Sequence, residues 1–221
     1  AADTNLVRLP KGMDPVVAAS LGCRFATAYR GVTAHGRVGE GDWVAVYGCG
    51  GVGLSAIQIA LSLGARVVAV DVAEPARRRA AELGATSLEA DGASERIIEL
   101  TGGGAHVAVD ALGSASTALA GVRSLRRRGR YVQVGLMLGP DARAPLPWDL
   151  LVSYELEVHG SHGMAARDYP AMLAMVTSGV LRPHELVGRV ISLAEAPAAL
   201  MAMDSPIAST PGLTVIDLSR H

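Results

Sequence analysis

The sequence has few aromatic residues, two cysteines and no long apolar run. Only 4% of its 221 residues are aromatic although 50% are hydrophobic, so its core must be built from alanine, valine, leucine and isoleucine. Such a core is typical of a parallel sheet covered by helices. A chain of this length can form one large domain, or one domain with a smaller attachment.

The other absences exclude several classes of protein. Cys23 and Cys49 are too few for a disulfide framework, and no apolar stretch approaches the length of a membrane-spanning helix. The amino terminus lacks the basic and apolar pattern of a signal peptide, so we expect a cytoplasmic protein. With 20 basic and 21 acidic residues, the net charge of -1 supplies no field that would recruit nucleic acid or a membrane. We therefore expect a small-molecule partner.

The most informative segment runs from Val44 to Asp71 and reads VAVYGCGGVGLSAIQIALSLGARVVAVD, which predicts a strand, a glycine turn, a helix and a second strand. Gly48 permits the tight turn, Gly50 lets the backbone approach a pyrophosphate, and Gly53 lets the helix pack closely on the strand. Phosphates would then lie on the first N–H groups of the helix. This pattern predicts a dinucleotide site.

Asp71 ends the second strand of this segment. A carboxylate there accepts hydrogen bonds from an adenosine ribose and repels a 2′-phosphate, so Asp71 favours NAD over NADP. An S-adenosylmethionine methyltransferase is an alternative, because that class also uses a glycine turn and an acidic strand end.

Strands and helices continue to alternate after Asp71, which predicts an α/β protein with a doubly wound parallel sheet. We expect six strands, the last of them an edge strand after a proline-rich stretch at 139–148. The patterns predict helices at 74–83, 94–100, 116–125, 166–178 and 193–203, and further strands at 106–110, 130–134, 156–160 and 213–218.

Six blocks of the chain resemble zinc-type alcohol dehydrogenases of the medium-chain dehydrogenase/reductase family, in the family's order and spacing. They are LGCRFATAYRGV at 21–32, GDWVAVYGCGGVG at 41–53, GARVVAVD at 64–71, AAELGAT at 80–86, TGGGAHVAVDALG at 101–113 and GRYVQVGL at 129–136. Methyltransferases do not share this set.

The resemblance implies a Rossmann domain joined to part of a second, GroES-like catalytic domain. We expect residues 1–24 to be the tail of the catalytic domain, 25–162 the NAD-binding domain, and 163–221 helices and a strand that return to the catalytic domain. The chain starts at Ala1 without methionine, so we expect the amino-terminal third of such a protein to be absent. The remaining zinc ligands and the proton relay would be absent with it.

The resemblance also implies roles for individual residues. Cys23 matches a ligand of the catalytic zinc, although the residues alone favour its interpretation as a small buried hydrophobe. Thr27 matches a threonine that lies along the nicotinamide, and we take it as the catalytic candidate. All these matched residues are expected at the carboxyl ends of strands. The expected cofactor-binding residues are Gly48, Gly50, Gly51, Val52, Gly53, Asp71, Leu112, Gly113, Val134, Gly135, Ser161 and His162.

Two features of the sequence bear on phosphate binding and nucleic acid. The cluster of Arg123, Arg126, Arg127, Arg128 and Arg130 is interpreted as cations at a helix end, which complement the helix dipole, and not as a nucleic-acid site. The family often places a basic residue near its final strand to meet the pyrophosphate, whereas this chain reads TPGLT at 210–214.

The sequence therefore predicts an NAD(H)-dependent, zinc-assisted alcohol dehydrogenase that moves hydride between an alcohol or carbonyl substrate and nicotinamide. The zinc site is incomplete in this chain, which we expect to be inactive alone. The alternatives are a non-catalytic NAD(H)-binding module and, less favoured, the methyltransferase. We also expect a homodimer or tetramer that forms through the edge strand at 156–160.

Overall fold

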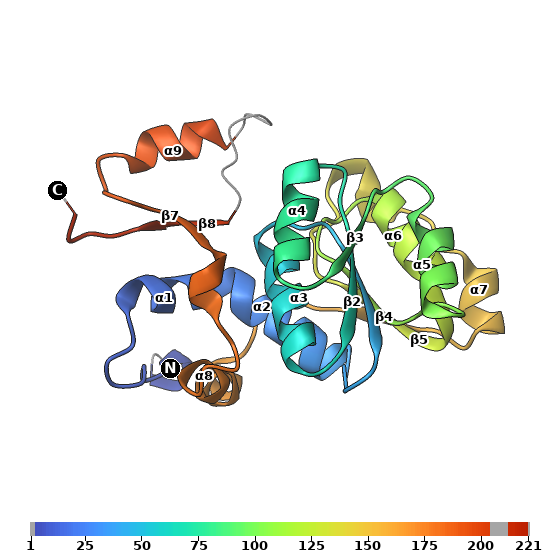
Figure 1. Cartoon of the computed structure of the whole chain (residues 1–221), viewed down its shortest axis with the longest axis horizontal. Helices are drawn as coiled ribbons and strands as arrows, with labels where there is room; N and C mark the ends of the chain where they lie inside the picture. Colours follow the sequence, from blue (N-terminus) through green and yellow to red (C-terminus); the bar gives the residue numbers. More distant parts are fainter. Residues whose placement is uncertain (1–2, 204–211, 221) are drawn as a thin grey trace.

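The computed structural model describes residues 3–203 and 212–220. A large parallel sheet with helices on both faces forms one end of the molecule, and a small two-stranded sheet with helices beside it lies at the other end (Figure 1). Within the described residues, no helix combines the length and the apolar character needed to cross a membrane.

The large sheet has six strands in the order β3-β2-β1-β4-β5-β6, and every neighbouring pair is parallel. The order reverses between β1 and β4, so crossovers pass over both faces. This is the doubly wound Rossmann arrangement, and it confirms the predicted fold. The strands are β1 (Trp43–Tyr47), β2 (Arg66–Val70), β3 (Thr86–Leu88), β4 (Ala105–Asp110), β5 (Leu125–Gln133) and β6 (Glu157–Gly160).

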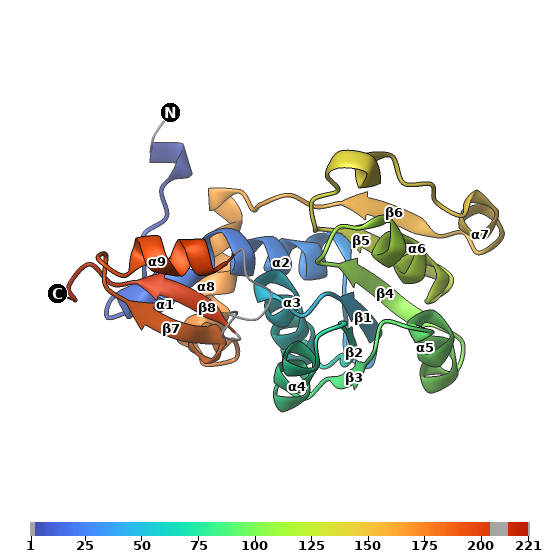
Figure 2. The same ribbon diagram turned by 90° about the horizontal axis from the view of Figure 1, so that it is seen from above.

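Both faces of the sheet are buried along β1, β2 and β4, which explains why these three strands are almost continuously apolar. Val44 and Val46 of β1 pack into a core with α3 (Gly51–Ser62) and α4 (Glu74–Glu82). Ala45 and Tyr47 of the same strand pack into a second core. Helices α5 (Ala93–Thr101) and α6 (Ala115–Arg123) cover that second face, and α7 (Trp148–Ser153) precedes the edge strand (Figure 2).

A continuous helical stretch leads into the sheet, which the sequence patterns did not predict. It consists of α1 (Pro15–Ser20), α2 (Ala26–Arg30) and the π-helical turns Leu21–Phe25 and Gly31–His35. Phe25 and Val32 are fully buried, and α2 packs against α3. The stretch runs through residues 24 and 25, where the sequence placed a domain boundary; the boundaries at 24/25 and 162/163 remain predictions.

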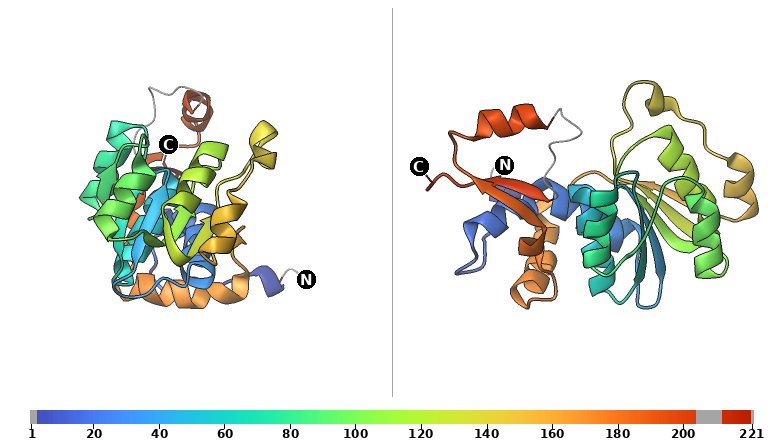
Figure 3. Two further views of the ribbon diagram at one scale, coloured as in Figure 1. Left: turned by 90° about the vertical axis from the view of Figure 1, so that its right-hand side faces the viewer. Right: turned by 45° about the horizontal axis from the view of Figure 1, so that its top comes forward.

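The smaller unit combines both ends of the chain. Strands β7 (Val187–Ile191) and β8 (Leu213–Ile216) pair in parallel, and α1 packs against both (Figure 3). Helices α8 (Tyr169–Thr177) and α9 (Ala196–Ala202) confirm the predicted helices, and β8 confirms the predicted final strand. Thr210 and Pro211 lie outside the described residues. Short 3-10 turns occupy Asp3–Asn5, Gly139–Arg143, Ala166–Asp168 and Pro183–Leu186.

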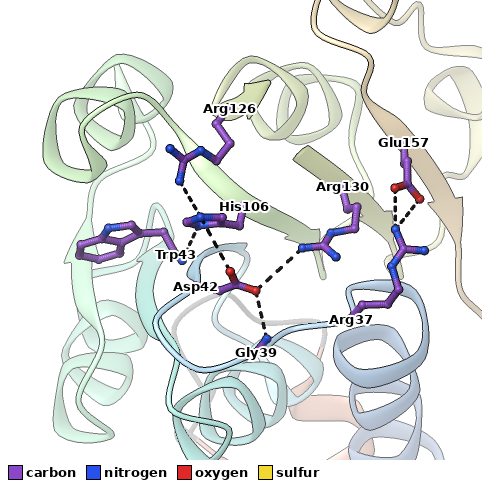
Figure 4. Close-up of polar contacts among 8 residues, drawn as sticks. All are labelled: Arg37, Gly39, Asp42, Trp43, His106, Arg126, Arg130 and Glu157. Carbon is purple, nitrogen blue, oxygen red and sulfur yellow. Dashed lines mark hydrogen bonds and ion pairs between the residues drawn. The ribbon is translucent and has the colours of Figure 1, made fainter. Parts of the chain in front are cut away.

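The interpretation of the arginine cluster as a helix end was wrong. Strand β5 begins at Leu125, so only Arg123 belongs to the last turn of α6. Arg126 Nη1 lies 2.6 Å from His106 Nε2, and Arg130 Nη2 lies 3.9 Å from Asp42 Oδ2 (Figure 4). Arg127 donates to the carbonyl of Ser153 (2.9 Å) and stacks on Tyr154, and the Arg128 N–H donates to the Tyr154 carbonyl (2.7 Å). The cluster therefore joins β5 to its neighbours at the amino end of the sheet.

The edge strand β6 is attached by an ion pair to the segment that directly follows the helical stretch. Arg37 Nη2 donates to both carboxylate oxygens of Glu157, at 2.5 and 2.6 Å (Figure 4). These hydrogen bonds, with one from His159, lower the pKa of Glu157 to about 2. Val158 of the same strand remains 42% exposed, so the outer edge of β6 is uncovered in a single chain.

Substitution of Gly53 by alanine is expected to destabilise the fold strongly. A Cβ atom at Gly53 would overlap the carbonyl oxygen of Gly48, and backbone cannot move aside cheaply. We expect Gly53→Ala to lower the free energy of unfolding by about 3 kcal/mol or more, measured by urea denaturation. Gly50→Ala is the matched control, because its Cβ would meet nothing within 4 Å. Equal stability of the two variants would contradict the close packing of α3 on β1.

Candidate dinucleotide site

The glycine turn after β1 has the geometry that the sequence predicts. Gly48 adopts a φ of 90°, and its N–H donates to the Val70 carbonyl at 2.8 Å, which joins the turn to the end of β2. Helix α3 then begins after Gly50, and no side chain caps its first N–H groups. These donors lie at the carboxyl end of the sheet, beside the point where strand order reverses.

Asp71 lies beside this turn and already forms two hydrogen bonds. Its Oδ2 accepts from the Cys49 N–H at 2.7 Å, and its Oδ1 accepts from the Ala73 N–H at 2.8 Å. A carboxylate oxygen has a second lone pair, so both atoms can accept a further hydrogen bond. The backbone therefore holds Asp71 in place with acceptor capacity remaining for a ligand.

A cavity of about 130 Å³ adjoins Asp71 between the ends of β1 and β2. Its walls include Gly48, Val70, Asp71, Ala90, Leu112 and Thr117, and they are mostly apolar. A mostly apolar cavity that is lined by one carboxylate suits the adenosine half of a dinucleotide. A larger cavity of about 920 Å³ lies elsewhere, between segment 4–11 and α8, and the glycine turn does not line it.

Asp110 organises the turn that carries Leu112 and Gly113, and sequence analysis missed it. It is fully buried at the end of β4, and its Oδ1 accepts the N–H groups of Leu112 and Gly113, both at 2.9 Å. Its Oδ2 accepts the hydroxyls of Thr117 (2.8 Å) and Tyr131 (3.1 Å). Burial, and then the Asp110 charge, raise the pKa of Tyr131. The sequence did contain one sign of this role, because Asp110 is an acidic residue directly before the turn that carries Leu112 and Gly113.

The expected nicotinamide residues at the ends of β5 and β6 come together around that turn. Val134 and Gly135 both donate their N–H groups to the Asp110 carbonyl, at 2.9 and 2.8 Å. A Cβ atom at Gly135 would overlap the amide nitrogen of Gly113, so the loops after β4 and β5 touch. The Ser161 N–H donates to the Gln133 carbonyl (2.8 Å), which aligns the end of β6.

Ser161 and His162 differ in their contacts. The hydroxyl of Ser161 is buried and, among the described residues, has no hydrogen-bond partner. The His162 carbonyl accepts a hydrogen bond from Arg30 Nη1 at 3.3 Å, so this residue contributes its backbone to the contact with the helical stretch.

Thr27 does not lie at the end of a strand, contrary to the expectation. It is buried within α2. One turn later, a Cβ atom at Gly31 would lie 3.2 Å from Val134 Cγ2 and 3.7 Å from Ser161 Oγ. The helical stretch therefore packs over the ends of β5 and β6 directly after α2, one turn from Thr27.

The two cysteines have opposite environments. Cys23 is exposed in a π-helical turn, beside the Gly22 carbonyl that accepts a hydrogen bond from the Tyr169 hydroxyl (3.3 Å). Cys49 is buried in the glycine turn, and burial, followed by the charge of Asp71, raises the pKa of its thiol to about 12. Cys23 is thus available to a ligand and Cys49 is a packing residue.

The described residues do not by themselves fit a zinc ion. In the part of the chain that the structure describes, no three histidine, cysteine or acidic side chains come together as a metal site. A catalytic zinc needs about three protein ligands, and Cys23 alone supplies one thiolate. The described part of the chain therefore supplies fewer ligands than a catalytic zinc requires.

The glycine turn, the uncapped start of α3 and the carboxylate of Asp71 are the features of a Rossmann fold that suit a dinucleotide. A family model described as zinc-binding dehydrogenase matches residues 51–178. The chain belongs to this family, in agreement with the resemblance of its sequence blocks.

Individual relatives agree with the family. An alcohol dehydrogenase of Geobacillus stearothermophilus is 32% identical over 80% of this chain and 52% of its own length. A sorbitol dehydrogenase of Halalkalibacterium halodurans is 30% identical over 98% of this chain and 64% of its own length. The solved alcohol dehydrogenase TADH from Thermus sp. ATN1 superposes with a TM-score of 0.87 at 32% identity, over 98% of this chain and 64% of that one. The chain thus spans between half and two thirds of these relatives.

Alkylation should distinguish the two thiols. We expect iodoacetamide at about pH 8 to modify Cys23 in the folded protein and to spare Cys49, whose buried thiol is not ionised there. Peptide mass spectrometry measures both sites, and a urea-unfolded sample in which both react is the control. Equal modification of Cys49 in the native protein would show that the glycine turn opens.

Loss of the Asp110 charge should weaken the turn beside the cofactor. In Asp110→Asn, an amide NH₂ group must face donors that now point at a carboxylate oxygen. We expect the free energy of unfolding to fall by about 3 kcal/mol, measured by urea denaturation. Asp149→Asn, an exposed change in the first turn of α7, is the control and should lower the free energy of unfolding by less than about 1 kcal/mol, the contribution of a charge at a helix end. An unchanged stability of Asp110→Asn would show that the network contributes little.

Proposed function

We propose that this chain is the NAD(H)-binding part of an alcohol dehydrogenase. The observation that carries the proposal is the uncapped start of α3 facing open space at Gly50, with the Asp71 carboxylate held beside the same turn. The first feature suits a pyrophosphate and the second an adenosine ribose. The family to which the chain belongs supports the same cofactor.

Bound NAD would supply the hydride acceptor of such a reaction. In our proposal, the N–H groups after Gly50 bind the pyrophosphate, and Asp71 accepts hydrogen bonds from the ribose hydroxyls. The loops at Leu112–Gly113 and Val134–Gly135 position the nicotinamide half, because Asp110 holds both of them. Helix α2 covers this end of the site and brings Thr27 to it, which excludes water.

The substrate that we propose is a primary or secondary alcohol, or the corresponding carbonyl compound. The names of the relatives support this, since they are an alcohol dehydrogenase and a sorbitol dehydrogenase. We further propose that Cys23 is one ligand of a catalytic zinc whose other ligands are not among the described residues. On this proposal, the 221-residue chain does not oxidise alcohols alone.

The uncovered edge of β6 supports the proposal that copies of the chain assemble as a dimer or tetramer. Backbone groups on the outer side of Glu157–Gly160 are free to pair with an identical strand, and Val158 offers apolar surface there.

Cofactor preference tests the proposed function directly. We expect NADH to bind about tenfold more tightly than NADPH, because the Asp71 carboxylate repels a 2′-phosphate. Asp71→Asn should reduce that preference, whereas Asp149→Asn should preserve it. Nicotinamide fluorescence titration measures the six affinities, one for each of the two cofactors with each of the three proteins.

The same titration separates the alternative functions. Binding of S-adenosylmethionine without binding of NADH would contradict the proposal in favour of a methyltransferase. NADH binding without turnover, in a protein extended to the full length of its relatives and loaded with zinc, would support a non-catalytic binding module.

A further inference from the structure

A guanidinium group lies over the first residue of α3. A Cβ atom built on Gly51 would lie 2.6 Å from Arg24 Cδ and 3.0 Å from Arg24 Nη1. Gly51 is the first of the twelve residues of this helix. The absence of a side chain at Gly51 is what lets the arginine lie against the backbone there.

Arg24 therefore places a positive guanidinium next to the positive end of the α3 dipole. The amino end of a helix carries about half a positive charge, so a cation beside it is unfavourable unless an anion lies between them. Within the described residues, Arg24 forms no hydrogen bond or ion pair that would compensate, and no side chain caps the helix. Both the guanidinium and the helix N–H groups are therefore unpaired donors in the same place.

The space beside these donors is open. A Cβ atom at Gly50 would meet nothing within 4 Å, although the adjacent Gly51 is tightly covered. The other side chain against Gly51 is Leu213, whose Cδ2 lies 3.1 Å from the Cβ position. Leu213 begins β8 and is apolar, so Arg24 is the charged one of the two side chains that lie against Gly51.

We propose that Arg24 binds the pyrophosphate of the dinucleotide, together with the first N–H groups of α3. The fork of an arginine donates two parallel hydrogen bonds to phosphate oxygens, and the phosphate charge would remove the repulsion between guanidinium and helix. This inference rests on the proposed function, because it assigns a residue to the same cofactor.

The position of Arg24 in the chain gives the contact a second consequence. Arg24 follows Cys23 directly in the π-helical turn Leu21–Phe25. A pyrophosphate held by Arg24 would hold that turn against α3, and with it the exposed thiol of Cys23. Cofactor binding would in this way position the candidate metal ligand.

The test compares ligands that contain a pyrophosphate with one that does not. Titrations of the full chain with NADH, ADP-ribose and adenosine are carried out on wild type, Arg24→Gln, Arg24→Lys and Arg96→Gln. Arg96 is exposed on α5 and serves as the control for loss of one positive charge. We expect Arg24→Gln to raise the Kd of NADH and ADP-ribose about tenfold, with Arg24→Lys in between and no change for adenosine or Arg96→Gln.

Thermal unfolding without ligand separates a binding role from a structural one. Because the arginine faces the positive end of a helix, Arg24→Gln should unfold at the same temperature as wild type or higher, while the stabilisation by NADH falls. A lower midpoint together with weaker adenosine binding would show a structural role and overturn the inference. Unchanged NADH binding in a folded Arg24→Gln variant would also overturn it, whereas wild type that binds none of the ligands would overturn the proposed function itself.

Discussion

The contact between Gly48 and Gly53 is the constraint on which the site depends. No side chain separates the carbonyl of Gly48 from the first turn of α3, so the helix starts directly against the end of β1. This proximity places the uncapped N–H groups of α3 at the carboxyl edge of the sheet, beside Asp71. In the same turn, Gly50 faces open space. Gly51 has no side chain, so Arg24 can lie against its backbone.

A single buried carboxylate shapes the opposite half of the site. Asp110 joins three elements, because its side chain accepts from the turn after β4, from Thr117 on α6 and from Tyr131 on β5. Its own carbonyl accepts both N–H groups at the end of β5. A charge in the interior is costly, and here four side-chain hydrogen bonds offset that cost.

The sequence predicted those helices and strands whose residues themselves constrain the backbone. The segment from β1 to β2 has glycines, apolar periodicity and an acidic end that each constrain the backbone, and it folds as predicted. Strand β3 has three residues, too few for a periodic pattern. The arginines of β5 interrupt its apolar pattern at the amino end of the sheet, where they contact His106 and Asp42. The contacts of Asp110 and Arg24 join residues far apart in the chain, so no local pattern could reveal them.

The helical stretch from α1 to His35 sets the spacing of three candidate residues along the site. Cys23, Arg24 and Thr27 all lie on it, within four residues of one another. A helix advances about 1.5 Å per residue, so the three groups are spaced over roughly 6 Å along one stiff axis. The stretch therefore fixes the positions of the three Cα atoms relative to one another. A slip of α2 along the sheet would shift all three groups together, and the insertion of a single residue would rotate them apart.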